Sequence, residues 1–167
     1  MTFAIFGIIG IIACWRLGDW RNWKLYYPTI LYLLIGDLVA DYVLLCRPLF
    51  TFGKFIESYP VADIAVMLLL YPGTVILYLA HYPKERMKQA LYILLWIAIY
   101  VAAELIARVT GGYSHYNGWN IWYSILVDTG MFPLLALHHK KPLLVWPISA
   151  VLCFALLWWF RIPLDCR

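Results

Sequence analysis

Two aspartates inside one long apolar stretch are the first feature of this sequence that could do chemistry. Residues 28–46 read PTILYLLIGDLVADYVLLC, and Asp37 and Asp41 are the charged residues within them. A spacing of four residues places both carboxylates on one face of a helix. Acids at membrane depth are energetically costly, and they typically mark pathways for ions or ligands. The stretch therefore predicts a functional site inside a membrane.

Acids in other apolar stretches are predicted to lie at matching depths. Asp128 falls near the middle of 119–138, as Asp37 does in its own stretch, and Glu104 and Arg108 fall in the outer half of 88–110. Carboxylates in a low-dielectric environment that lack a basic partner hold a proton or recruit a cation. With aromatic rings nearby, they suit a proton, a cation or a small cationic ligand. The predicted ligand-binding residues are Asp37, Asp41, Asp128, Glu104, Arg108, Tyr71 and Tyr100.

A purely structural role for the same acids is the alternative. Glu104 and Arg108 are four residues apart in the favourable order, so an ion pair near the membrane interface explains them. Asp37, Asp41 and Asp128 would then bond to Tyr and Thr hydroxyls and hold helices together, each bond contributing only about 0.6 kcal/mol. Three coincident burials are harder to explain in this way than one. The set is therefore interpreted as an acidic, aromatic-lined cavity within the membrane.

The composition identifies an integral membrane protein. Of the 167 residues, 65% are hydrophobic and 13% are charged, and the mean hydropathy is +0.78. A soluble domain is about half apolar and about a quarter charged. The sequence has no linker, low-complexity segment or separate soluble region, so 1–167 is expected to form a single transmembrane helical domain. Because Lys and Arg lie mainly between the apolar stretches, the charge pattern reports topology and excludes a nucleic-acid-binding protein.

The apolar stretches predict an all-α, polytopic bundle of six transmembrane helices. Residues 18–27 are rich in Trp and Tyr and are expected to form an interfacial loop, with Pro28 in the first turn of the following helix. Pro72 and Gly73 predict a kink in the third helix. The first stretch also resembles a signal peptide, but no Lys or Arg precedes it, which favours a retained helix. The expected helices are 2–17, 28–46, 61–81, 88–110, 119–138 and 143–160.

The charges between the stretches predict the orientation. Eight basic residues lie on one side: Arg16, Arg21, Lys24, Lys84, Arg86, Lys88, Lys140 and Lys141. Five lie on the other: Arg47, Lys54, Arg108, Arg161 and Arg167. The more basic side faces the cytoplasm by the positive-inside rule. We therefore expect a multi-pass protein of the cell membrane with both termini outside. Cys46 and Cys166 both fall on the outer side, and whether they pair is left open.

Three short sequence strings carry a resemblance to a known family. Residues 26–31 read YYPTIL, residues 117–120 read NGWN and residues 131–135 read MFPLL. With these strings the chain resembles an uncharacterised family of small multi-spanning membrane proteins from spore-forming bacteria, over most of its length. The resemblance implies a location in the membrane. It implies no activity and no cofactor.

The interpretation that these features favour is a transporter, a channel or a substrate-binding membrane subunit. It would contact the lipid bilayer and work alone, as a homo-oligomer or with partner membrane subunits. The alternative is a non-catalytic assembly or accessory subunit whose acids engage a partner's helix. An enzyme is less favoured, because no nucleophile or set of metal ligands accompanies the acids. His81, His138 and His139 suit a charged cap at the cytoplasmic side better than a metal or haem site.

Overall fold

Six helices and one pair of short strands make up the computed structural model, which describes residues 2–52 and 59–163. The prediction of an all-α bundle of six helices is confirmed. The helices are α1 (Thr2–Leu17), α2 (Trp23–Leu44), α3 (Tyr59–Ala80), α4 (Arg86–Val109), α5 (Ile121–Lys140) and α6 (Pro142–Phe160). A single 3-10 turn, Trp20–Asn22, precedes α2, and the strands are β1 (Phe50–Phe52) and β2 (Tyr113–His115).

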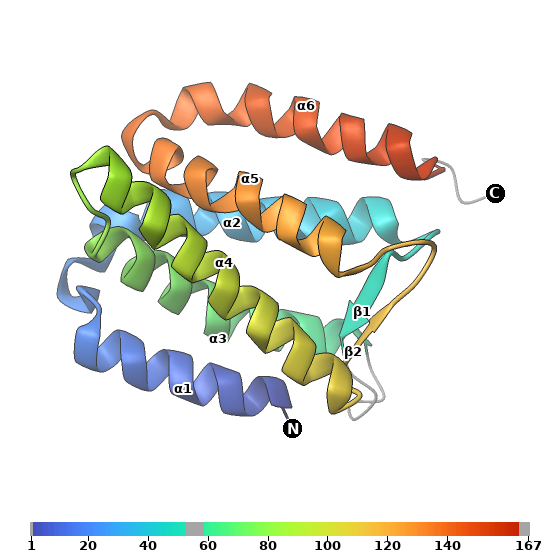
Figure 1. The fold of residues 1–167 in the computed structure, drawn as a ribbon, viewed down its shortest axis with the longest axis horizontal. Coiled ribbons are helices and arrows are strands. Elements are labelled where there is room, and N and C mark those ends of the chain that lie inside the picture. Colours follow the sequence, from blue (N-terminus) through green and yellow to red (C-terminus); the bar gives the residue numbers. More distant parts are fainter. Residues whose placement is uncertain (1, 53–58, 164–167) are drawn as a thin grey trace.

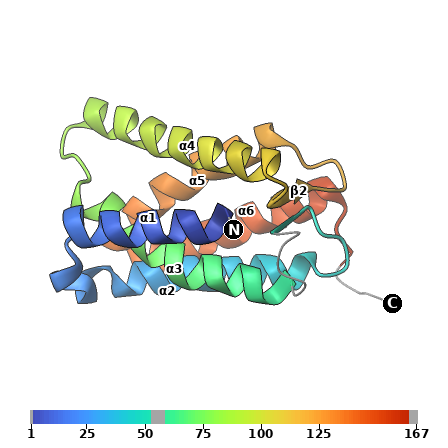
Figure 2. The same ribbon diagram turned by 90° about the horizontal axis from the view of Figure 1, so that it is seen from below.

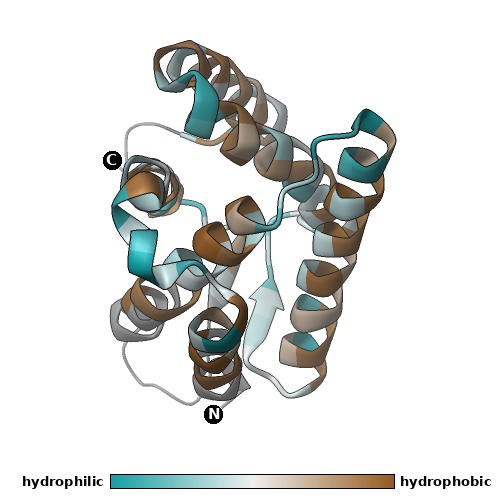
Figure 3. Cartoon of the chain, turned by 90° about the vertical axis from the view of Figure 1, so that its left-hand side faces the viewer, coloured by the Kyte–Doolittle hydropathy of each residue, from teal (hydrophilic) through white to brown (hydrophobic). Residues whose placement is uncertain are grey.

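Successive helices run in alternating directions, so the bundle has two chemically different ends (Figure 1). The strand end carries β1 and β2, together with the start of α1 and the finish of α6. The basic end carries the connections α1–α2, α3–α4 and α5–α6, with the eight basic residues counted above. Figure 3 looks onto the basic end and shows hydrophilic residues gathered in these connections, in front of mainly hydrophobic helices.

The outer faces of the helices are apolar, as a bilayer requires. Trp158 is 81% exposed, Val109 89% and Leu143 87%, and a continuous apolar surface of this kind is unfavourable in water. Four helical segments are long and apolar enough to cross a membrane: Trp20–Leu44, Arg86–Val109, Ile121–Lys140 and Pro142–Phe160. Phe6–Leu17 and Met67–Ala80 are shorter apolar helices. The chain is a membrane protein, and at least four of the six predicted spans have the length and composition of a span.

Helix boundaries agree with the sequence prediction to within about two residues, except at the start of α2. That helix begins at Trp23, so Pro28 lies inside it and not in its first turn. The aromatic segment 18–27, predicted as an interfacial loop, thus supplies the first turn of α2. Helix α3 likewise continues past Pro72. The strands were not predicted, because β1 pairs with a partner about sixty residues away, with Phe50 opposite His115 and Phe52 opposite Tyr113.

The packing places α2, α3 and α5 at the centre of the bundle (Figures 1 and 2). Helix α1 packs on α3, α4 and α6 pack on α5, and α2 contacts both α3 and α5. Gly73 lies at the crossing of α1 and α3, where a Cβ atom would be 3.5 Å from the Gly10 carbonyl oxygen, an ordinary van der Waals distance, so alanine would also fit. Small residues at such crossings are the usual means by which membrane helices pack closely.

An aromatic layer forms the core between α3, α4 and α5, nearer the basic end. Tyr78 and Phe132 are completely buried, and the Tyr78 hydroxyl donates a 2.9 Å hydrogen bond to the Phe132 carbonyl. Tyr92 stacks on Tyr78 with ring centroids 5.5 Å apart, and Trp96 packs against both Tyr78 and Phe132. Edge-to-face and offset contacts of this kind each add about 0.5–1.5 kcal/mol beyond the burial of area. We call these four residues the aromatic layer.

Replacing Phe132 with alanine tests the importance of the aromatic layer. Phe132→Ala is expected to lower the free energy of unfolding by about 3–5 kcal/mol, because it opens a cavity among rings that cannot collapse into it. Phe154→Ala is the matched control, since Phe154 is 66% exposed on α6. Thermal unfolding in detergent should show a large loss for the first variant and a small one for the second. Equal losses would mean that the layer contributes nothing special to stability.

Candidate functional site

Asp37 lies on the inner side of α2 and faces α3. It is half-buried, and one of its carboxylate oxygens accepts a 3.0 Å hydrogen bond from the Tyr71 hydroxyl. Asp41, one turn further along α2, interacts electrostatically with Asp37. Tyr71 and both aspartates were predicted site residues, and the structure brings them together. The hydrogen bond from Tyr71 satisfies part of the carboxylate's bonding capacity but neutralises no charge.

Asp128 lies on α5 at the depth of Asp37. Asp37 is seven residues from the strand end of α2 and Asp128 is seven residues from the strand end of α5, about 10 Å along each axis. The two helices are in contact, and Asp128 is half-buried. The sequence prediction that both acids share one depth agrees with this placement.

Tyr100, on α4, is the residue that connects the two aspartates. It interacts electrostatically with both Asp128 and Asp37. Its hydroxyl donates a 2.9 Å hydrogen bond to the Thr74 hydroxyl on α3, and its ring packs edge-on against Phe132 at 5.2 Å. The acids therefore lie on the strand side of the aromatic layer, and Tyr100 belongs to both regions.

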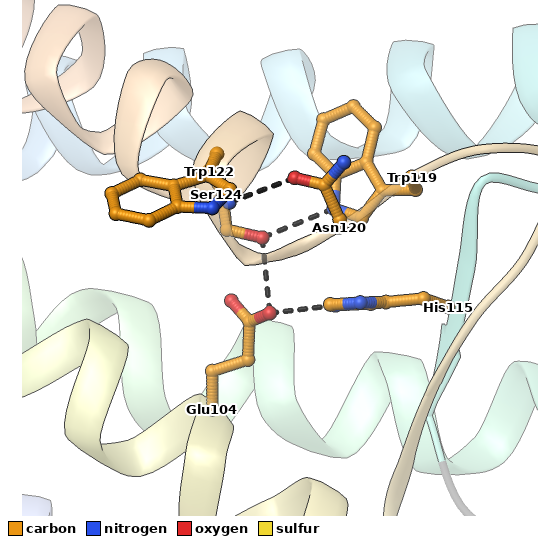
Figure 4. A network of polar contacts seen from close by, with 6 residues as sticks. All are labelled: Glu104, His115, Trp119, Asn120, Trp122 and Ser124. Carbon is orange, nitrogen blue, oxygen red and sulfur yellow. Dashed lines mark hydrogen bonds and ion pairs between the residues drawn. The ribbon is translucent and has the colours of Figure 1, made fainter.

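Glu104 forms a polar network of its own at the strand end, and Figure 4 shows it from close by. One carboxylate oxygen, Oε1, accepts a 3.0 Å bond from the Ser124 hydroxyl and lies 2.7 Å from Nε2 of His115. Trp119 donates from its indole nitrogen to Ser124 at 3.0 Å. The network joins α4, α5 and β2, and the side chains of His115 and Glu104 are only 7% and 13% exposed. Glu104 also interacts electrostatically with Asp128.

The predicted ion pair between Glu104 and Arg108 is wrong. Glu104 points between helices toward His115, whereas Arg108 is exposed and lines a surface groove of about 490 Å³. The physical reason is the direction of the two side chains: the buried side of α4 at this level is taken by Glu104 and Ala107, so Arg108 projects outward. Arg108 therefore does not belong to the buried acid cluster, although it lies beside the outer surface of His115.

Two partners of the acids, His115 and Ser124, were missed by sequence reasoning. Thr74, which accepts the hydrogen bond of Tyr100, was missed as well. The signal available in the sequence was weak, because a single His or Ser in a short segment has no periodicity that reports its direction. The pairing of β2 with β1 turns His115 toward α4, and only tertiary structure reveals it.

Among the described residues, the contact of His115 with Glu104 is the one that joins an acid of the cluster to a basic side chain. Among the residues that the structure describes, no Lys or Arg forms an ion pair with Asp37, Asp41 or Asp128. Lys54 and Arg167 lie outside those residues. Carboxylates in an apolar bundle without a basic partner are stable only when they are protonated or bound to a cation. The cluster is thus able to take up positive charge.

A second polar cluster, at the basic end, is fully occupied by its own contacts. His138 is 3% exposed, lies 3.1 Å from the Thr29 hydroxyl through Nδ1 and stacks on Tyr32 at 4.3 Å. Tyr32 in turn bonds to the Ser149 hydroxyl at 2.6 Å. In the described part of the chain no group of three or more His, Cys, Asp or Glu residues could hold a metal ion. This cluster fastens α2, α5 and α6 together and presents no set of metal ligands.

The described cysteines differ in their chemistry. Cys14 and Cys153 are free thiols, whereas Cys46, at the strand end of α2, is disulfide-bonded. Cys166, the other cysteine expected on the outer side, lies outside the described residues. Disulfides persist on the oxidising side of a membrane.

Comparison with known proteins adds no relative: no family model, no curated protein and no solved structure matches the chain. The site must be interpreted from its own chemistry. Its acids come from three helices, its donors are Tyr, Ser and His, and it lies in the half of the bundle nearer the strand end. This arrangement can bind and release protons or hold a small cation.

Removing Glu104 tests the network around it. Glu104→Ala leaves His115 and Ser124 without their shared acceptor in a buried place, and we expect a loss of about 3 kcal/mol in the free energy of unfolding. Arg108→Ala, on the exposed side of the same helix, should change it by less than about 0.5 kcal/mol. Unfolding in detergent measures both. A double-mutant cycle between Glu104 and His115 should be non-additive, and additivity would contradict the pair.

Proposed function

We propose that this protein binds a cation at the acids in the strand half of its bundle, as a transporter, a channel or a substrate-capturing membrane subunit. The observation that carries the proposal is that Asp37, Glu104 and Asp128 come from three different helices and lie around Tyr100. Asp37 and Asp128 have no basic partner among the described residues. Membrane bundles keep such acids only at a cost, which a bound cation or proton offsets.

The environment of the acids supports a binding role better than a purely adhesive one. To hold two helices together, one hydrogen bond between neighbouring side chains is enough. Here, however, acids lie near other acids: Asp37 and Asp41 are one helical turn apart and their charges repel each other. The charge of Glu104 likewise repels that of Asp128. Like charges at close range are unfavourable in a low dielectric. A cation shared among them removes this repulsion. On this proposal the packing of the helices positions the acids, and holding the helices together is not the main role of the acids.

Asymmetry along the membrane axis is consistent with access from the strand end. The acids lie about 10 Å or less from the strand ends of their helices, and the aromatic layer lies between them and the basic end. Rings packed at 5.2–5.9 Å around Phe132 obstruct water and ions. The proposed binding site is therefore closed toward the basic side in this conformation, and access is proposed from the strand side.

The proposed location is the cell membrane, with several passes and with the strand end outside. Two observations support this orientation: the eight basic residues at the opposite end and the disulfide-bonded Cys46 at the strand end. The three sequence strings suggest membership of the small multi-spanning family from spore-forming bacteria, and this membership stays a prediction. It implies only a location in the membrane.

Charge removal at the two aspartates tests the function. Purified protein in detergent should be stabilised by a bound cation, because a ligand at about 100 times its dissociation constant contributes about 2.7 kcal/mol to folding. Thermal unfolding is measured over a pH series and with added sodium, potassium, guanidinium or tetramethylammonium at constant ionic strength. Asp37→Asn and Asp128→Asn keep the shape of the side chain but should lose the pH- or cation-dependent stabilisation.

The matched control for this experiment is Glu85→Gln, which removes an exposed acid at the basic end. It should behave like the unchanged protein. Two results together would contradict the proposal. The stability of the unchanged protein would respond to none of these cations, and its response to pH would be no larger than that of the Asp37→Asn and Asp128→Asn variants.

Accessibility labelling tests the orientation independently. The background carries alanine at Cys14 and Cys153, the free thiols. Tyr116→Cys, at the strand end, should react with a membrane-impermeant maleimide in intact cells, whereas Lys84→Cys, at the basic end, should react only after the cells are permeabilised. Both parent residues are exposed, so burial does not explain a difference. The reverse pattern would invert the proposed topology.

A further inference from the structure

We propose that the cation bound by the acid cluster is a proton, and that it enters through the His115–Glu104 pair from the groove beside β2. This inference rests on the proposed function, because it names the ligand and the route of the same site. Three features of the described residues carry it: where the pair lies, what surrounds it, and what its hydrogen bond can transmit.

The pair separates the outer surface from the acids. His115 lines the groove of about 490 Å³ together with Arg108, Tyr113 and Ser114. On its other side His115 reaches Glu104 through the 2.7 Å contact of Nε2 with Oε1, and Glu104 interacts with Asp128. One hydrogen bond thus connects the surface groove to Glu104, the member of the acid cluster nearest the groove, and Glu104 is linked to Asp128 electrostatically. A hydrogen bond passes a proton, whereas a hydrated metal ion or an organic cation needs an open channel.

The charges at the groove also select against larger cations. Arg108 is exposed there and is permanently positive. Charges of like sign repel each other, so a sodium or ammonium ion is disfavoured at this mouth. A proton is not excluded, because it arrives on water or buffer and is handed to an imidazole.

The groups that face the pair are few, and all of them are consistent with a relay. Asp128 approaches from α5, and Arg108 lies on α4 itself. Tyr113, in β2, packs edge-on against the His115 ring, with the ring centroids 5.4 Å apart. Ser124 adds a neutral donor to Glu104 Oε1. The described part of α1, which also packs against α4, carries its titratable groups, Cys14 and Arg16, toward the opposite end.

The step conserves protons and charge. Because a carboxylate is only an acceptor, Nε2 of His115 carries the hydrogen of the bond to Glu104. A hydronium ion in the groove gives a proton to Nδ1 and becomes water, and Nε2 releases its proton to Glu104 Oε1. The products are a neutral His115 in its other tautomer and a neutral Glu104. Loss of the negative charge on Glu104 changes the electrostatic field at Asp128, so the two sites are linked reciprocally.

Time-resolved infrared spectroscopy after a pH jump tests the route. The carbonyl band of protonated carboxyl groups reports the protonation of the acids directly, and the part lost in Asp37→Asn and Asp128→Asn belongs to the cluster. His115→Gln keeps a donor toward Glu104 but cannot relay a proton. We expect it to slow the growth of the cluster's band by roughly 10²-fold at unchanged final amplitude. His81→Gln, an exposed histidine at the basic end, should change neither rate nor amplitude.

Further variants make the test independent of any single one. Glu104→Gln keeps an acceptor for His115 and Ser124 and should show the same slow growth. In His115→Ala, added imidazole should restore the fast growth of the cluster's band. No such rescue is expected if the His115 ring has only a structural role. An unchanged rate in folded His115→Gln or Glu104→Gln overturns the route, and a cluster band that never appears in the unchanged protein overturns the proton as the ligand. The proposed function itself is overturned only if the thermal unfolding series also shows no response to pH or to any of the added cations. A rate that depends on sodium or tetramethylammonium and not on pH overturns the proton as ligand.

Discussion

Carboxylates inside an apolar bundle need hydrogen-bond donors or positive charge, and much of this structure is arranged around that requirement. Tyr71 supplies a donor to Asp37, and Ser124 and His115 supply two to Glu104. These donors come from α3, α5 and β2, so satisfying the acids also fixes how these elements pack on α2 and α4. Unsatisfied charge at this depth would cost several kcal/mol. The acids are therefore a constraint on the packing as well as a candidate site.

The aromatic layer gives the bundle a polarity along the membrane axis. Tyr78, Tyr92, Trp96 and Phe132 occupy the core toward the basic end, and the acids occupy the core toward the strand end. Tyr100 touches both, because its ring packs on Phe132 while it interacts with Asp37 and Asp128. A motion of Tyr100 would therefore change the packing of the aromatic layer and the environment of the acids together. Packed cores switch between discrete arrangements and do not deform continuously.

The strand pair has an effect beyond covering one end of the bundle. By pairing two loops that are about sixty residues apart, it places His115 over Glu104 and brings the loop of Leu49 against Trp119 in a small second core. A pair of two short strands is marginal by itself. Here the buried Glu104–His115 pair and the second core anchor it, so the cap and the acid cluster stabilise each other.

The sequence by itself determined the membrane class, the six helices, their boundaries to within a few residues, and the shared depth of Asp37 and Asp128. These follow from local properties: apolar length, helical rise and the positions of charges along each helix. Only tertiary structure decided the partners of the acids. Because β1 pairs with β2, the partner of Glu104 is His115 and not Arg108. Helix α2 also begins earlier than predicted, within the aromatic segment 18–27. Such choices depend on contacts between distant segments, and neither composition nor periodicity reports which side chains those contacts bring together.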